Sequence, residues 1–172
     1  MKTHILSAIL LSLALSVFAS AQNKSVYTDL TGARCKTIKS NPEEGGSYVG
    51  ECKGIGGYRL QVVEGDLRQT VNVITPSKKK LELNLWRAFG GFSTVGPKAE
   101  WRMEKGVPVA LIVRFMVSEI ADQPEKITSY LIVSKVSTTA ACIVGAVQPG
   151  KNQNIEARKL ADAAPSKPCE EF

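Results

Sequence analysis

The most regular pattern of apolar and polar positions lies in the middle of the chain, between residues 89 and 117. Polar and apolar residues alternate over 99–104, the period-two pattern of a half-buried strand, and the apolar face is formed by Ala99, Trp101 and Met103. A turn at Lys105-Gly106 leads into the apolar run 107–117. We predict that this run is the central strand, against which the rest of the fold packs.

Other segments with strand character occur on both sides of this centre, at residues 26–30, 58–63, 67–74, 81–86, 127–136 and 141–147. Residues 67–74 and 81–86 both alternate and are separated by a turn, so we expect an antiparallel hairpin. The run 127–136 is almost continuously apolar, which is typical of a strand buried on both faces. Residues 35–52 include Pro42 and three glycines, and we predict an irregular surface segment there.

A single helix is predicted over residues 152–164. Asn152 is a suitable N-cap, and prolines follow the segment, as they commonly do at helix ends. One face of this helix carries small and apolar residues, namely Ala157, Leu160, Ala161 and Ala164. The fold class is therefore mainly β (α+β): an antiparallel sandwich or partly closed barrel of about seven strands with one C-terminal helix.

Residues 1–21 have the features of a secretory signal peptide: the basic Lys2, an apolar stretch and the small-residue cleavage site Ala19-Ser20-Ala21. The alternatives are less favoured, because a membrane anchor needs about 20 apolar residues and a lipid anchor needs a cysteine directly after the cleavage site. Residues 22–172 are then expected to form one exported, periplasmic or secreted domain without a transmembrane segment.

The remaining 22–172 segment carries 21 basic and 16 acidic residues, a net charge of +5. The charges are scattered, which favours simple solubility over a dedicated anionic partner. Four cysteines allow three disulfide pairings, and an exported chain is expected to oxidise them. Short local loops favour the pairs Cys35–Cys52 and Cys142–Cys169, and the alternative is that one cysteine is a reactive thiol.

Histidine is missing from residues 22–172, since His4 is the only one in the chain. This excludes Ser-His-Asp and Cys-His catalysis and histidine-ligated zinc, so we expect neither a metal nor a cofactor. A carboxylate pair remains possible for glycan hydrolysis, with Trp86 and Trp101 as stacking surfaces. Glu100 and Glu104 flank Arg102, but this pattern is more typical of a solvated strand face.

Two shorter patterns match known motifs only by their letters. Ser77 and Lys80 have the spacing of a serine–lysine pair, yet they lie in an expected hairpin turn. Gly54, Gly56 and Gly57 are better explained by a turn with positive φ than by a phosphate-binding loop, because a strand follows where a helix should begin. Basic and aromatic residues near each other in the sequence are too weak a pattern to indicate specific nucleic-acid binding.

The chain resembles small uncharacterised exported proteins of Gram-negative bacteria. The resemblance lies in the segments GGFSTVGPKAEWR at 90–102, PVALIVR at 108–114 and SKPC at 166–169, and in Tyr130. The resemblance covers most of the segment after the signal peptide. It implies a periplasmic setting, and it supplies no activity and no functional residues.

The hypothesis that we favour is a non-enzymatic, β-rich binding module for a protein or a cell-envelope glycan or lipid, of the kind that inhibits a hydrolase. Loops on a rigid scaffold commonly carry recognition, so we place the contacts on the 90–98 loop. The candidate residues are Phe92 and Lys98, with Trp86, Arg87 and Arg102 nearby. The competing interpretation is that the glycines form a bend and Phe92 packs in the core. The other functional alternatives are a histidine-free hydrolase and a structural envelope component.

Overall fold

The computed structural model describes residues 23–41, 43, 46–120 and 122–171, so the predicted signal peptide lies outside the described residues. The described part contains ten strands, one α-helix and three short 3-10 helices. The strands are β1 (Lys24–Asp29), β2 (Cys35–Asn41), β3 (Ser47–Lys53), β4 (Arg59–Gly65), β5 (Arg68–Ile74), β6 (Lys80–Glu82), β7 (Phe92–Glu104), β8 (Val107–Ser118), β9 (Ile127–Val136) and β10 (Ala141–Val147). The helices are α1 (Gln153–Asp162), η1 (Gly32–Arg34), η2 (Leu85–Ala88) and η3 (Ala164–Ser166).

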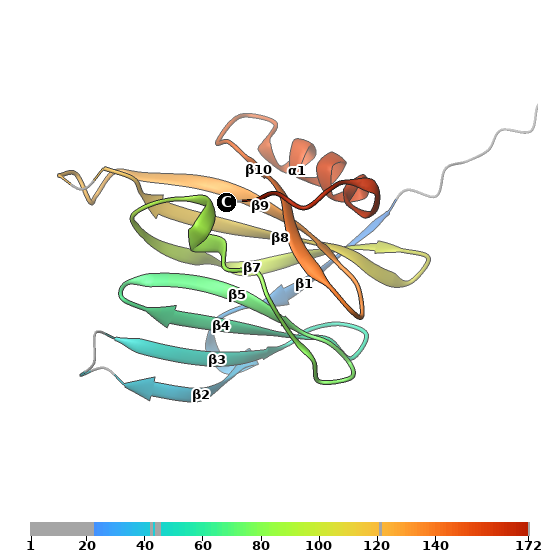
Figure 1. Cartoon of the computed structure of the whole chain (residues 1–172), viewed down its shortest axis with the longest axis horizontal. Helices are drawn as coiled ribbons and strands as arrows, with labels where there is room; N and C mark the ends of the chain where they lie inside the picture. The colour runs from blue at the N-terminus through green and yellow to red at the C-terminus, as the bar shows by residue number, and fades with distance from the viewer. Residues whose placement is uncertain (1–22, 42, 44–45, 121, 172) are drawn as a thin grey trace, which may run out of the picture.

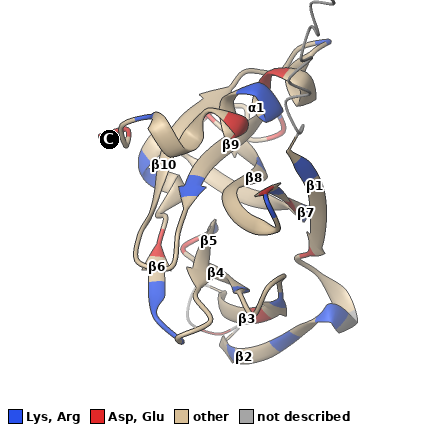
Figure 2. Cartoon of the chain, turned by 90° about the vertical axis from the view of Figure 1, so that its right-hand side faces the viewer, with Lys and Arg blue, Asp and Glu red and all other residues tan. Residues whose placement is uncertain are grey.

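The ten strands form one open sheet in the order β10-β9-β8-β7-β5-β4-β3-β2, with β1 added to β7 and β6 added to β5. Neighbouring strands are antiparallel, except that β5 and β7 meet in a parallel bridge at Arg68 and Ser93. This narrow junction lets the sheet fold into two antiparallel halves, β2–β6 and β1 with β7–β10, which lie one above the other in Figure 1 and are seen from the side in Figure 2.

The predicted class, mainly β with one C-terminal helix, is correct, but the strand number and the partly closed barrel are wrong. The sheet has ten strands and is not closed. The additional strands come from residues 35–52, where β2 and β3 form a hairpin instead of an irregular segment. The β2 side chains are largely exposed, so the segment shows no apolar alternation although its backbone pairs with β3 from Cys35 to Asn41.

Two apolar layers stabilise this arrangement. The inner layer lies between the halves of the sheet, where Trp101 and Phe115 pack in one cluster with Leu60 and Val73. The burial of Ala99 and Trp101 and the half-burial of Met103 confirm the predicted register of β7. The outer layer lies between the other face of β8–β10 and helix α1, which covers that face in Figure 1.

Helix α1 packs on the sheet through small residues. Ala157 and Ala161 of α1 and Ala164 of the following η3 are fully buried, as the sequence pattern indicates, whereas Leu160 is only partly buried. The sheet residue opposite is Gly145, where an added Cβ would lie 2.9 Å from the Leu160 side chain. Asn152 stands at the N-cap position but makes no side-chain capping hydrogen bond.

The two disulfides join Cys35 to Cys52 and Cys142 to Cys169, the pairs that the sequence favours. Cys35 and Cys52 lie directly opposite each other in the β2–β3 ladder. The second bond holds the C-terminal tail against β10, and the Glu170 N–H also donates to the Ile143 carbonyl there, at 2.8 Å. Two such bonds indicate an oxidising compartment. Within the described residues, no helix is both long enough and apolar enough to cross a bilayer.

Candidate binding surface

The five predicted contact residues do not form one surface. Phe92 begins β7 and is exposed, while Trp86 and Arg87 lie in η2. The expected 90–98 loop is wrong beyond its two glycines, because Phe92 is already the first residue of a thirteen-residue strand. Arg102 is ten residues further along β7, and at about 3.3 Å per residue this separates it from Phe92 by about 33 Å.

Arg102 is a buried structural residue and not a surface contact. It is 3% exposed, and its guanidinium donates to both carboxylate oxygens of Asp162 at 2.7 and 2.8 Å. It also donates to the Ser25 hydroxyl. The expectation of a solvated face is wrong for Arg102, because α1 and β1 bring Asp162 and Ser25 over this part of β7, whereas Glu104 is exposed as expected.

Glu100 belongs to a partly buried group of charges beside Arg102. Its carboxylate accepts hydrogen bonds from Arg158 at 2.7 Å, Ser25 at 2.6 Å and Tyr27 at 3.2 Å. Desolvation raises the pKa of Glu100, but these hydrogen bonds and the charge of Arg158 outweigh it, and the net pKa lies below the ordinary value. The pKa of Arg158 is raised, mainly by its hydrogen bond to Glu100. The group therefore holds α1 against β7 and β1.

This geometry argues against a carboxylate dyad at Glu100 and Asp162. The general acid of such a dyad needs a raised pKa so that it stays protonated near neutral pH, and the pKa of Glu100 is shifted the other way. Asp162 forms a bidentate pair with Arg102, so both of its carboxylate oxygens are already engaged. Within the described residues, no cluster of three or more His, Cys, Asp or Glu side chains is arranged to hold a metal ion.

The serine–lysine pattern lies in a turn, as expected, and its two members have separate partners. The Ser77 hydroxyl is 2.9 Å from that of Thr75, and the Lys80 ammonium is 2.6 Å from the Glu82 carboxylate. Because Lys80 is paired with an acid and not directed at Ser77, nothing in this turn activates the hydroxyl.

Exposed apolar side chains gather instead at one end of the molecule. We define the end patch as Leu67, Phe92, Ile120 and Ile127, whose side chains are 55%, 49%, 45% and 54% exposed. They come from the β4–β5 turn, the start of β7, the segment that joins β8 to β9 and the start of β9. An exposed group of large apolar residues is a recognised feature of interaction sites.

Strand pairing brings the members of the end patch together. The Ser93 N–H donates to the Leu67 carbonyl at 3.0 Å, so the β4–β5 turn lies against the start of β7. Phe92 in turn pairs with Ser118, and Ser118 pairs with Ile127. The row Leu67, Phe92, Ser118 and Ile127 therefore crosses neighbouring strands at the same end of the sheet.

Gly91 allows this close approach. Its φ is +94°, and an added Cβ would lie only 2.0 Å from the Ser118 carbonyl oxygen. Gly90 has open space at the corresponding position. Of the two glycines, Gly91 is therefore the one that the backbone requires.

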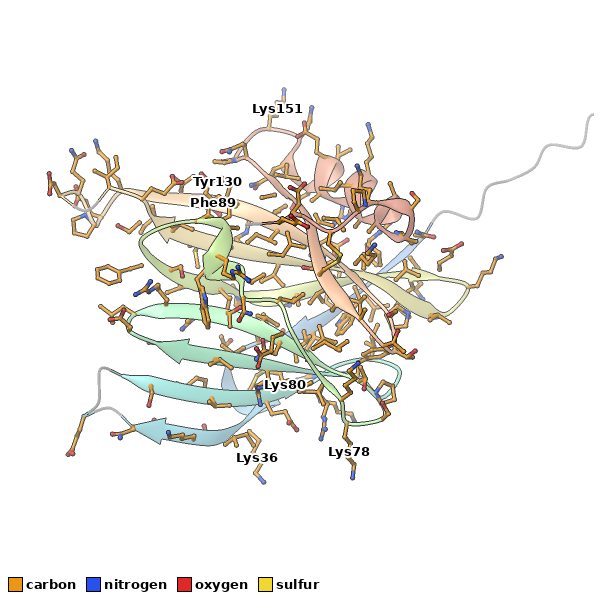
Figure 3. The ribbon with its side chains drawn as sticks, in the orientation of Figure 1. Lys36, Lys78, Lys80, Phe89, Tyr130 and Lys151 are labelled. Atoms are coloured by element: carbon orange, nitrogen blue, oxygen red, sulfur yellow. A yellow bond between two sulfur atoms is a disulfide. The ribbon has the colours of Figure 1, made fainter. Side chains whose placement is uncertain are left out.

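Trp86 adjoins the end patch. With Val63, Asp66 and Arg68 it lines a hollow of about 260 Å³ beside the β4–β5 turn. The end of helix η2 is anchored, because Phe89, the residue after it, stacks on Tyr130 with ring centroids 4.1 Å apart, and Figure 3 shows these two residues side by side. The Leu85 N–H donates to the Thr70 hydroxyl at 2.9 Å. The surface around Trp86 thus rests on a well-anchored scaffold.

The other two predicted contacts lie elsewhere. Lys98 is exposed and 3.5 Å from the Asp29 carboxylate, about 20 Å along β7 from Phe92. Arg87 lies near the C-terminal tail and lines a polar pocket of about 440 Å³ with Glu82 and Glu170.

Three members of the end patch, Leu67, Ile120 and Ile127, were not predicted from the sequence. The one sequence feature that could have indicated them is that each is a large apolar residue beside or within a charged turn segment.

Comparison with known proteins found no matching protein-family model, curated protein or solved structure.

Proposed function

We propose that the chain is an exported binding module that holds a protein partner at the end patch. The single observation that supports this proposal is the gathering of four large exposed apolar side chains on four neighbouring segments. Burying each would contribute about 25 cal/mol per Å² of apolar surface removed from water. The two disulfides fit an exported protein, and the predicted signal peptide points to the periplasm or the exterior.

A protein partner fits this end better than an anionic membrane. The segment that joins β8 to β9 carries Glu119, Asp122 and Glu125 against the single base Lys126. Such an acidic excess repels an anionic bilayer, whereas basic groups on a protein partner would complement it. Two of the five predicted contact residues belong to this region: Phe92 is a member of the end patch, and Trp86 adjoins it.

The structural-envelope alternative is less favoured because the outer edge of the sheet is protected. Edge strand β2 carries Lys36 and Lys39 and has an irregular register between Thr37 and Lys39. Figure 3 shows Lys36 extending from β2 away from the rest of the fold. Lysines and bulges are common means of preventing edge-to-edge assembly.

The test is capture of partners by the immobilised, oxidised protein from an envelope extract of the source cell, with identification by mass spectrometry. The variant Phe92→Ala should weaken the captured complex by about tenfold or more, as expected when a central aromatic contact is truncated. Ile127→Ala should also weaken it.

Ile155→Ala is the matched control, because Ile155 on α1 is 53% exposed and Ile127 is 54% exposed. Equal loss of binding in Ile127→Ala and Ile155→Ala, or full binding by Phe92→Ala, would contradict the proposal. The proposal would also be contradicted if the immobilised protein retained no partner protein in a stoichiometric amount.

A further inference from the structure

A second concave surface lies at the other end of β8, where the strand begins. A pocket of about 680 Å³ is lined there by apolar groups that include Val107, Pro108, Val136 and the Cys142–Cys169 disulfide. It extends from exposed Val107 to buried Tyr58, in the inner core. Its volume is within the range of about 300–1,000 Å³ that small-molecule sites occupy.

The strand register explains why the pocket exists. Pairing between β8 and β9 ends at Ala110 and Lys135, although β8 begins at Val107. β9 continues beyond this point and pairs through Val136 with Ala141 of β10. The first three residues of β8 therefore have no partner on the β9 side, and the two strands leave an opening that the β9–β10 turn borders.

One lysine lines this opening, and a second contacts the turn that borders it. The Lys135 ammonium donates to the Lys167 carbonyl at 2.6 Å, and the Lys79 ammonium donates to the Thr139 carbonyl at 2.9 Å. Lys135 lines the pocket, and Thr139 lies between two of its lining residues, Thr138 and Ala140. Figure 2 shows the basic turn before β6, which contains Lys79, facing the viewer at this end of the molecule.

Neither ammonium has an acidic partner. Among the described residues, no carboxylate lies within ion-pair distance of Lys79 or Lys135, whereas the neighbouring Lys80 is paired with Glu82. An ammonium has three donors, so each lysine keeps donors for a ligand after its bond to a backbone carbonyl. No acidic side chain belongs to the described lining of the pocket; Glu170 follows Cys169 but lines the separate polar pocket.

We propose that this pocket binds a long-chain fatty acid, with the aliphatic chain among the apolar groups and the carboxylate at Lys135, while Lys79 beside the bordering turn adds a second positive charge. An apolar interior with cations that lack acidic partners near its opening complements an amphiphile that carries one negative charge. At about 30 Å³ for each non-hydrogen group, the volume that a water molecule takes, the pocket has room for roughly 20 such groups, which is one chain and not two. The site is independent of the end patch, since about 36 Å of β8 separates them.

The test is isothermal titration calorimetry of the oxidised protein with octanoate, dodecanoate and hexadecanoate. Affinity should rise about fourfold for each methylene group that becomes buried, until the pocket is full. The double variant Lys79→Met and Lys135→Met keeps the aliphatic stems and removes both charges. It should bind hexadecanoate at least about tenfold more weakly, because hydrogen bonds to charged groups are lost, and it should bind hexadecanol as the parent does.

Lys151→Met is the matched control, since it removes one lysine charge on the far side of the molecule from Lys78 and Lys80 in Figure 3. Ala140→Trp is a second variant at an exposed lining position, and it should block both the acid and the alcohol. Urea unfolding would establish that each variant is folded.

Affinity that does not depend on chain length, or equal affinities in the double variant and Lys151→Met, would overturn the proposal. Binding only to vesicles of anionic phospholipid, or only to peptides with an apolar C-terminus, would also overturn it. Phe92→Ala should leave the binding of fatty acid unchanged, so the two proposals can fail separately.

Discussion

At the scale of single residues, the least expected feature is the charge group beneath helix α1. Arg102 and Glu100 occupy the face of β7 opposite Trp101, where alternation alone indicates exposure to solvent. In the structure the Arg102 side chain is almost completely buried, because residues from β1 and α1, far apart in the sequence, cover it. A period-two pattern shows which residues share a face of a strand, but it does not show which elements pack on that face.

The lowered pKa of Glu100 predicts how stability depends on pH. A carboxyl group whose folded-state pKa lies below its ordinary value of 4.5 stabilises the fold fully above that value. This contribution to stability is lost as the pH falls through the folded-state pKa, because the Glu100 carboxylate is then protonated in the folded protein as well as in the unfolded chain. Glu100→Gln should therefore lower the free energy of unfolding by about 1–3 kcal/mol at neutral pH, and the difference should vanish in acid.

Urea unfolding at several pH values measures this effect. Glu82→Gln is the control, since Glu82 and its partner Lys80 are each half exposed and such pairs contribute about 0–1 kcal/mol. A difference between Glu100→Gln and the parent protein that persists unchanged below the folded-state pKa would contradict the assignment.

At the scale of elements, the long strands were predictable and the short or exposed ones were not. The runs at 107–117 and 127–136 agree closely with β8 and β9, because strands buried on both faces need apolar residues throughout. The hairpin of β2 and β3 gave no such signal. Its residues are held by backbone pairing and the Cys35–Cys52 bond while most β2 side chains remain in water.

The start of β7 offers a prediction at this scale. Gly91→Ala should lower the free energy of unfolding by about 1–3 kcal/mol or more, since a non-glycine residue at φ +94° is strained and its Cβ would collide with the Ser118 carbonyl. It should also weaken partner capture by displacing Phe92. Gly90→Ala is the control, with open space around the added methyl group. Equal stabilities of the two variants in urea would show that the backbone does not require Gly91.

At the scale of the whole molecule, the two disulfides act in different places. The Cys35–Cys52 bond joins paired strands at one edge of the sheet, and the Cys142–Cys169 bond fixes the tail across β10. The sequence separations of 17 and 27 residues correspond to about 3–3.5 kcal/mol each in the loop-entropy model.

A digest of the non-reduced protein should contain the linked peptides of Cys35 with Cys52 and of Cys142 with Cys169. Replacing Cys142 and Cys169 by alanine should lower stability by about 3 kcal/mol and should also weaken the binding of hexadecanoate, because this bond is part of the pocket wall. A Cys35–Cys142 link would refute the pairing. An unchanged affinity for hexadecanoate would show that the Cys142–Cys169 disulfide does not contribute to the binding site.

The sequence by itself determined the class of fold, the register of β7, the position of the helix and the disulfide partners that local spacing favoured. These features follow from short-range periodicity, from the turn and cap residues and from the number of cysteines. The tertiary structure alone decided that Arg102 is buried, that Leu67, Phe92 and Ile127 meet at one end, and that β8 and β9 separate at the other. Each of these depends on which distant strands become neighbours, and no local pattern of residues carries that information.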